Sequence, residues 1–143
     1  MIEISSDKYL IGPWVFGQVG KPWHPEGREA IGIVRDEAVL AGTVIEDYTG
    51  VSAQMHVAVA HPHVPLRKFV VAGFNYVFNY LDCRQVLGSV KSSNLKALKF
   101  DLRLGFEAIA VIPNVYPDNV DMIILRMERS RCPWISAASR EAA

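Results

Sequence analysis

The sequence has few cysteines and no long apolar run, and both shortages exclude whole classes of protein. Cys83 and Cys132 are the two cysteines among 143 residues, which is too few for a disulfide framework, and they form no CxxC pair. No apolar run approaches the ~20 residues of a membrane-spanning helix, and the N-terminus has no cationic start followed by an apolar stretch. We therefore expect a cytoplasmic protein with reduced thiols and no membrane partner.

An excess of positive charge is also missing. Fifteen Lys and Arg residues balance fifteen Asp and Glu residues, so nothing in the net charge would attract nucleic acid. Half of the residues are hydrophobic and about a fifth are charged, which is typical of a folded globular chain. We expect residues 1–143 to form a single domain, with a flexible tail at 136–143. The irregular segment at 1–28 should contain a short helix or strand followed by an irregular loop.

Three short runs of β-branched and apolar residues follow the first segment, at 30–34, 38–46 and 53–60. The connecting sequences RDE and DYTG are typical of hairpin turns. The third run ends in HPHVP, whose prolines stop a sheet. These patterns predict three consecutive antiparallel strands.

The pattern then becomes helical. Apolar residues recur at three- and four-residue steps from Leu66 to Leu81, and Pro65 suits the first helical position. A strand at 84–90, a helix from Asn94 to about Arg103, and strands at 106–112 and 120–127 follow, the last two joined by a turn. This order predicts an α/β (α+β) fold with a mixed sheet and one crossover helix, and therefore one parallel strand pair.

The segment SSNLKALKFDLRLGF resembles the second signature region of the GNAT acetyltransferase superfamily. In that region an asparagine opens a helix, an alanine follows one turn later, and the helix ends at Leu-Gly-Phe. Here those residues are Asn94, Ala97, Leu104, Gly105 and Phe106. Each has a local reason as well, since an asparagine caps a helix and a glycine at C′ ends it.

A longer stretch, about residues 29–135, resembles small GNAT proteins frequent in phages and prophages. That subgroup carries a Phe-x-Tyr-x-Phe run on the long helix, Leu-x-Cys before the next strand, and Cys-x-Trp near the end. The matching positions are Phe74, Tyr76, Phe78, Leu81, Cys83, Cys132 and Trp134.

The resemblance implies a GNAT-like sheet with antiparallel N-terminal strands, a splayed parallel pair and a C-terminal hairpin. It also implies an acetyl-CoA-dependent N-acetyltransferase that acts on a primary amine of a small molecule or a protein. The coenzyme arm would lie in the gap between the splayed strands, and its pyrophosphate at the start of the long helix, where free N–H groups favour an anion. The implied acetyl-CoA contacts are Val57, Ala58, Val59, Leu66, Arg67, Lys68, Asn94 and Ala97.

The chain departs from the GNAT pattern in two places. No glycine lies between Val51 and Ala72, where the family has a glycine-rich phosphate loop. Asp101 stands where many members have a tyrosine that acts as general acid, and an ionised carboxylate protonates a thiolate poorly. These departures leave open a non-catalytic GNAT-like module that binds coenzyme or a protein partner, and also a phage structural protein with an occluded cleft.

The candidates for catalysis each have a second interpretation. His56, on the splayed strand, is a candidate base or substrate contact, or else a packed strand histidine. Glu46 begins a group with Asp47 and Tyr48 that would border the acceptor side and attract a cationic amine, or else forms a solvated turn. Tyr116 is a candidate acid from the last turn, or else an ordinary turn tyrosine.

Two further patterns bear on metals and partners. His56, His61 and His63 could be taken for a metal cluster, but zinc sites have tighter spacing with cysteine or carboxylate ligands, so we expect no metal. Tyr76 and Tyr80 lie off the apolar stripe, where they are either exposed or in contact with a second subunit of a homodimer.

Overall fold

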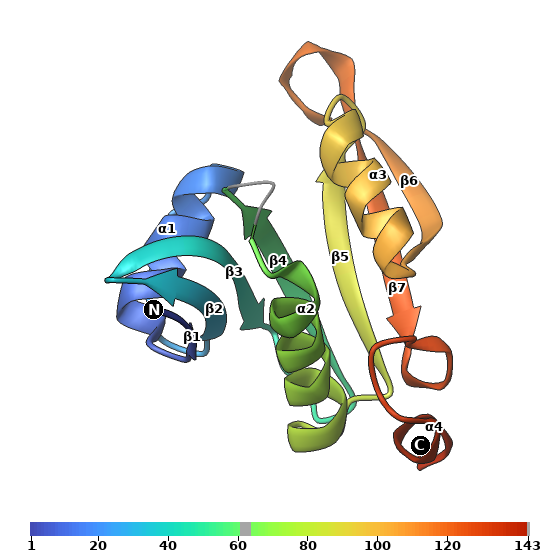
Figure 1. The fold of residues 1–143 in the computed structure, drawn as a ribbon. Helices are drawn as coiled ribbons and strands as arrows, with labels where there is room; N and C mark the ends of the chain where they lie inside the picture. The colour runs from blue at the N-terminus through green and yellow to red at the C-terminus, as the bar shows by residue number, and fades with distance from the viewer. Residues whose placement is uncertain (61–63, 143) are drawn as a thin grey trace.

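The computed structural model describes residues 1–60 and 64–142, and its centre is a seven-stranded mixed sheet (Figure 1). The strand order is β1-β2-β3-β4-β5-β7-β6. The strands are β1 (Ile2–Ser5), β2 (Glu29–Arg35), β3 (Ala38–Glu46), β4 (Ser52–Val59), β5 (Gln85–Lys91), β6 (Glu107–Tyr116) and β7 (Val120–Glu128). The helices are α1 (Lys8–Val19), α2 (Leu66–Asn75), α3 (Leu95–Leu104) and α4 (Ala137–Glu141), with short helical turns η1 (Tyr76–Tyr80), η2 (Pro117–Asn119) and η3 (Arg129–Arg131).

The predicted order of strands and helices is confirmed. Strands β2, β3 and β4 pair antiparallel in sequence, α2 crosses over to β5, and β4 and β5 form the parallel pair. The predicted helix at 66–81 winds as an α-helix through Asn75 and as a π-helix from Tyr76 to Tyr80. Among the helices described, none is long and apolar enough to cross a bilayer.

The segment at 1–28 is more regular than predicted, because it contains both β1 and the twelve-residue helix α1 before the irregular connection at 20–28. The side chain of Asp7 caps α1 by accepting a hydrogen bond from the Tyr9 N–H at 3.0 Å. A proline at position 13 inside a helix costs about 3 kcal/mol. Burial outweighs that cost, since Ile11, Val15 and Phe16 are fully buried, each contributing about 1.5–3 kcal/mol.

The prediction of a flexible tail at 136–143 is also wrong for the residues that the structure describes. Helix α4 begins after Ser136, whose side chain accepts a hydrogen bond from the Ser139 N–H. The buried guanidinium of Arg129 donates to the Ser139 carbonyl at 2.7 Å, and Arg140 donates to the Ile135 carbonyl at 2.7 Å. Two arginines therefore hold the end of the chain through carbonyl contacts that hydrophobic periodicity does not reveal.

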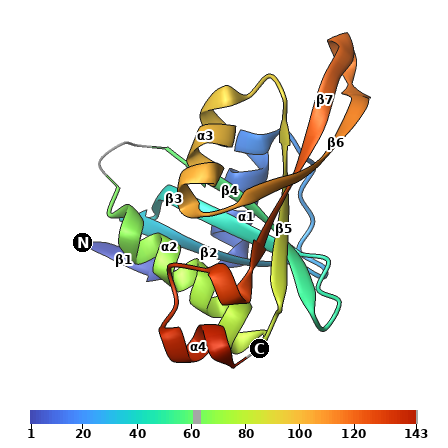
Figure 2. The ribbon, with the colours of Figure 1, turned by 90° about the vertical axis from the view of Figure 1, so that its right-hand side faces the viewer.

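The last hairpin is longer than the predicted strand at 106–112. Strand β6 continues to Tyr116, past Pro113, because an edge strand tolerates a residue without an N–H. Asn114 has a positive φ of 56° and donates its N–H to the side chain of Asp121 at 3.1 Å. Figure 2 shows the β6–β7 hairpin projecting beyond the rest of the sheet.

Helices cover both faces of the sheet and bury two clusters. The cluster on the α1 face is small, its buried residues are aliphatic apart from Phe16, and Trp14 and Trp23 pack against it. The larger cluster lies under α2 and α3 and contains a stack of Phe74 on Phe78, with ring centroids 6.2 Å apart. Further fully buried members of the larger cluster are Ile33, Val77, Cys83, Val86, Leu125, Met127 and Cys132.

The predicted splaying of the parallel pair is present. In the described part of the chain, β4 and β5 pair at Ser52↔Gln85, Ala53↔Val86 and Gln54↔Leu87. Beyond these three pairs, β4 continues along β3 to Val59 and β5 continues along β7 to Lys91. Figure 1 shows the two strands diverging toward their C-terminal ends. The sheet is thus open between them on the side where a crossover helix begins.

Candidate functional site

Glu46 and His56 form a buried pair just past the point where β4 and β5 separate. His56 pairs in register with Val44, so Glu46, two residues further along β3, lies on the same face of the sheet. Nε2 of His56 contacts Oε2 of Glu46. His56 is 9% exposed and Glu46 is 8% exposed, so the pair is largely withdrawn from water.

Two cations from the segment after α1 surround the pair. Nη2 of Arg28 lies 3.3 Å from Oε1 of Glu46, and Nζ of Lys21 lies 3.5 Å from Oε2. Nζ of Lys21 is also 3.5 Å from Nε2 of His56. Phe16 supports the group from α1, with its ring edge-on to the imidazole at 5.3 Å and 4.5 Å from the Arg28 guanidinium carbon.

The surroundings keep Glu46 charged and His56 neutral. Burial alone would raise the pKa of Glu46, but His56, Lys21 and Arg28 together hold that pKa below its usual value. Burial lowers the pKa of His56, and the charge of Lys21 lowers it further, which outweighs the opposing effect of Glu46. At neutral pH the imidazole is therefore free to accept a proton.

A cavity of about 480 Å³ opens beside this pair on the side away from α2. The β3–β4 turn contributes Asp47 and Tyr48, and the Tyr48 hydroxyl donates to the Leu81 carbonyl at 2.8 Å, which fixes the turn against the end of η1. Glu46, Asp47 and Tyr48 thus all line this cavity. The lining residues are His24, Glu26, Gly27, Arg28, Glu46, Asp47 and Tyr48.

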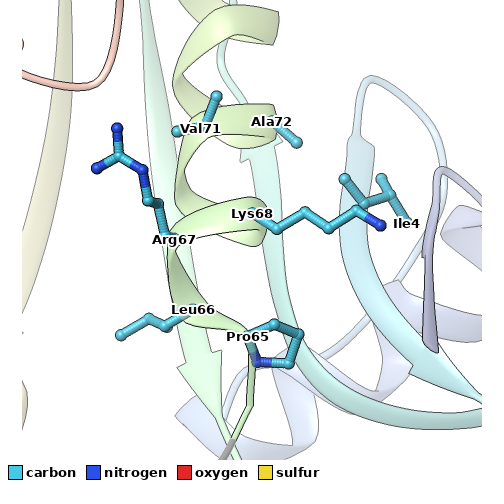
Figure 3. Close-up of a pocket in the computed structure, with 7 residues that line it drawn as sticks. All are labelled: Ile4, Pro65, Leu66, Arg67, Lys68, Val71 and Ala72. Atoms are coloured by element: carbon cyan, nitrogen blue, oxygen red, sulfur yellow. The ribbon is translucent and has the colours of Figure 1, made fainter.

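A second cavity of about 640 Å³ lies at the start of α2. In Figure 3 the side chains of Arg67 and Lys68 point to opposite sides of the helix, with Lys68 reaching toward Ile4 of β1. The guanidinium carbon of Arg67 lies 5.8 Å from the Trp134 ring centroid. Among residues 1–60 and 64–142, no side chain caps this helix end, and no acidic residue lies in its first turn. The first-turn N–H groups from Leu66 onward are thus available to an anion, while the two cationic side chains diverge.

The predicted coenzyme contacts on β4 divide between the two faces of the sheet. Val57 packs against the larger cluster under α2, whereas Ala58 packs against the α1 cluster. Val59, at the end of the strand, is partly exposed. All three pair with β3, and they lie past the last β4 residue that pairs with β5. Their backbone therefore borders the opening.

Helix α3 confirms Asn94 as a helix cap. Its Oδ1 accepts a hydrogen bond from the Ala97 N–H at 3.2 Å, and Ala97 is half-buried.

Asp101 lies one turn beyond Ala97, and its carboxyl group is not the ordinary ionised carboxylate that the sequence predicts. Burial raises the pKa of Asp101 to about 6, so it can carry a proton near neutral pH much more often than an exposed aspartate.

Tyr116 and the histidine group lie elsewhere. The ring of Tyr116 is at the tip of the β6–β7 hairpin, with Nζ of Lys91 5.0 Å from its centroid. Within the ranges described, no group of three or more His, Cys, Asp and Glu residues is arranged to hold a metal ion. His61 and His63, part of the considered cluster, lie outside the described residues.

Lys21 and Arg28, the two cations of the site, were not predicted from the sequence. The available signal was Gly20, which ends α1 in the left-handed conformation with φ of 75°. The N–H of Lys21 then bonds the Phe16 carbonyl at 2.9 Å. A recognised helix end would have placed Lys21 near Phe16, but its distance to Glu46, 25 positions away, depends on tertiary packing.

Comparisons with known proteins agree on the fold. No family model and no curated protein matches the chain in sequence. A solved structure described as a GNAT-family acetyltransferase, from Desulfovibrio desulfuricans, is 18% identical with a TM-score of 0.69, covering 90% of this chain and 99% of that one. A spermidine/spermine N-acetyltransferase from Vibrio cholerae is 11% identical with a TM-score of 0.70, covering 90% and 93%. An Escherichia coli ribosomal-protein alanine N-acetyltransferase is 19% identical with a TM-score of 0.65, covering 90% and 94%. The chain therefore has the fold of the GNAT acetyltransferases.

Proposed function

We propose that this protein is an N-acetyltransferase that transfers an acetyl group from acetyl-CoA to a primary amine. The observation that carries the proposal is the buried Glu46–His56 pair, in which His56 lies two residues past Gln54, the last β4 residue paired with β5. A neutral imidazole there stands at the beginning of the opening between the strands. The fold shared with known N-acetyltransferases supports the same reaction class, although function belongs to the site rather than to the fold.

The residues of the pair divide the proton transfer between them. His56 accepts a proton from the attacking amine, since burial and Lys21 keep its ring neutral. Glu46 orients the ring and stabilises the imidazolium that forms. Arg28 holds the carboxylate in place through Oε1 and is itself fixed by donation to the His24 carbonyl at 3.2 Å. Both carboxylate oxygens of Glu46 thus face a cation or the imidazole in the resting state.

The coenzyme fits the opening and the start of α2. Acetyl-CoA supplies an activated acyl group on a thioester and a pyrophosphate that needs an anion site. The uncapped N–H groups of Leu66, Arg67 and Lys68 provide one, and the helix dipole adds to it. Because the segment before α2 has no glycine, we assign the anion contact to helix N–H groups rather than to a glycine-rich loop.

The acceptor enters from the cavity beside Glu46. Glu26 and Asp47 contribute exposed carboxylates to its lining, whereas the guanidinium of Arg28 is already paired with Glu46. Oε2 of Glu26 lies 3.5 Å from Nδ1 of His24, and a cationic acceptor could replace this contact. The two carboxylates therefore favour an acceptor with positive charge in addition to the reacting amine. A polyamine, a lysine side chain or a chain N-terminus would meet this requirement.

Two measurements on the purified chain test the proposal. Millimolar acetyl-CoA should raise the melting temperature, and a panel of polyamines, lysine peptides and N-terminal peptides should release free coenzyme A thiol for at least one acceptor. Arg67→Glu should reduce the thermal shift by placing a negative charge at the anion site, whereas Lys99→Glu on the outer face of α3 is a matched charge control. No shift and no thiol release with the folded wild-type chain would reject the proposal. A shift without release would leave a coenzyme-binding module in its place.

A further inference from the structure

Trp134, from the Cys-x-Trp pattern near the end of the chain, joins the two helices on either side of the opening. Its Nε1–H donates to the Leu104 carbonyl at the end of α3 at 2.7 Å, and its carbonyl accepts from Nδ2 of Asn75 at the end of α2 at 3.3 Å. The guanidinium carbon of Arg67, in the first turn of α2, lies over its ring at 5.8 Å from the centroid. We propose that Trp134 is a positioning residue of the coenzyme site, which holds the Arg67 guanidinium where it binds the phosphates. The inference rests on the proposed acetyl-CoA-dependent function.

The end of α3 fixes the indole. The last carbonyls of a helix have no partner within the helix, and the indole N–H satisfies the one at Leu104. Gly105 then ends α3 with φ of 117°, and a Cβ there would lie 3.4 Å from Cδ of Pro133, so a glycine permits the close approach of the two segments. On either side of the Pro133–indole segment, Cys132 and Ile135 are buried in the larger cluster.

The other side of the indole faces α2. The chain after β7 returns toward this helix (Figure 2), and the Asn75 side chain holds it there by donating to the Trp134 carbonyl. In the core below, the ring centroids of Phe74 and Phe106 are 6.0 Å apart. Trp134 is therefore an outer tie between α2 and the end of α3, in addition to this aromatic contact in the core.

The charge of Arg67 is available to an anion. Its side chain and that of Lys68 point to opposite sides of α2, and Lys68 reaches toward Ile4 (Figure 3). Among residues 1–60 and 64–142, no carboxylate lies within ion-pair distance of the Arg67 guanidinium. An aromatic ring attracts a guanidinium without neutralising its charge, so Arg67 can still form charge-assisted hydrogen bonds with phosphate oxygens.

A positioned arginine compensates for the missing glycine-rich loop. Without glycine between Val51 and Ala72, fewer backbone N–H groups can approach a pyrophosphate closely. A long side chain that is free in solvent loses much rotamer entropy when it binds, and this loss weakens the contact. Because the ring already restricts the guanidinium, less entropy remains to be lost when the coenzyme binds.

Calorimetric titration of acetyl-CoA into the folded variants tests the inference. Trp134→Leu removes both the ring and the N–H donor and should weaken binding about tenfold, whereas Trp134→Phe keeps a ring and should weaken it about threefold. Trp14→Leu is the matched control, because Trp14 is also half-buried but packs against the α1 cluster, and it should leave the dissociation constant unchanged. Circular dichroism confirms that each variant is folded.

Dependence on Arg67 separates positioning from a general loss of packing. Arg67→Gln should weaken acetyl-CoA binding about tenfold by itself. Adding Trp134→Leu to Arg67→Gln should then weaken binding by less than about twofold more, because the side chain that Trp134 positions is gone. The same loss in both backgrounds would mean that Trp134 acts through packing alone and would overturn the inference. If Trp134→Leu does not fold, Trp134→Phe in the two backgrounds gives the same comparison.

The same titrations separate this inference from the proposed function. A folded wild-type chain that does not bind acetyl-CoA would reject both. Binding by the wild type with equal dissociation constants for the two Trp134 variants would reject the positioning role and leave the proposed function intact. Weaker binding by Trp134→Leu that depends on Arg67, together with unchanged binding by Trp14→Leu, would support the inference.

Discussion

Oε2 of Glu46 contacts Nε2 of His56 across strands β3 and β4, and the pair lies beside the residues where the parallel pairing of β4 and β5 ends. Both side chains are more than nine-tenths buried, and the two cations near them, Lys21 and Arg28, come from a different part of the chain. Several measurable properties depend on this arrangement.

The pH dependence of transfer should follow His56. Because its pKa is below the ordinary histidine value, kcat/KM should be constant near neutral pH and fall only in moderately acidic solution. Glu46→Gln should shift this limb to lower pH, since the lost carboxylate no longer favours the imidazolium. Lys21→Gln should shift it to higher pH, since the lost cation no longer opposes the imidazolium. Shifts of the two variants in the same direction would contradict this assignment.

Stability should fall with acid in a defined window. The pKa values of Glu46 and His56 are both lower in the folded chain than in the unfolded one. The stability that they contribute is therefore present above the unfolded values and is lost as pH falls, first for His56 below about 6.5 and then for Glu46 below about 4.5. Because Asp101 contributes with the opposite sign over part of this range, urea unfolding from pH 7.5 to 3 should show the loss as a difference in the free energy of unfolding between the wild type and each single variant, His56→Gln and Glu46→Gln. His56→Gln should flatten the upper part of the curve, and an unchanged curve would show that the histidine titrates normally.

The fold was predictable because its signals are local. In the runs at 30–34, 38–46 and 53–60, apolar residues either alternate with polar ones or follow one another along a single strand. Gly105 ends α3 with φ of 117°, as expected for a glycine at the C′ position. The length of helix α1 was underestimated because Pro13 and its internal glycines lower its local helix propensity, whereas burial against β3 provides the compensating energy. Local patterns are least informative where packing overrides propensity.

The site was predictable only in part. Glu46 and His56 lie ten positions apart on one hairpin, so a correct strand register already places them on one face. Arg28 and Lys21 come from an irregular connection whose path depends on where Trp23 packs, which no periodicity encodes. The raised pKa of Asp101 likewise depends on burial under neighbouring elements rather than on its position in a motif.

The contact between Gly12 and Trp23 links the stability of α1 to the site. A Cβ at position 12 would lie 2.1 Å from Cη2 of Trp23, so Gly12→Ala must displace the indole ring and the connection that carries Lys21 and Arg28. We expect a loss of about 1–3 kcal/mol in the free energy of unfolding and a lower kcat/KM. Gly17→Ala is the matched control on the same helix, because a Cβ there meets nothing within 4 Å. It should be neutral or stabilise by up to about 1 kcal/mol without loss of activity. Equal effects of the two substitutions would show that Trp23 does not hold the connection.

The buried carboxyl group of Asp101 should lower the free energy of unfolding at neutral pH. Burial raises the pKa of Asp101 from its usual 3.8 to about 6, so the folded state binds a proton more tightly than the unfolded state. Its favourable contribution is complete below the unfolded value and is lost as pH rises through about 6. Asp101→Asn removes the buried charge and should raise the free energy of unfolding at pH 7.5 by about 1–3 kcal/mol, with little change at pH 4. Asp118→Asn, in the turn between β6 and β7, is a matched exposed control that should change stability little at either pH. A gain from Asp101→Asn that is equal at pH 4 and pH 7.5 would mean that its cause is not the buried charge.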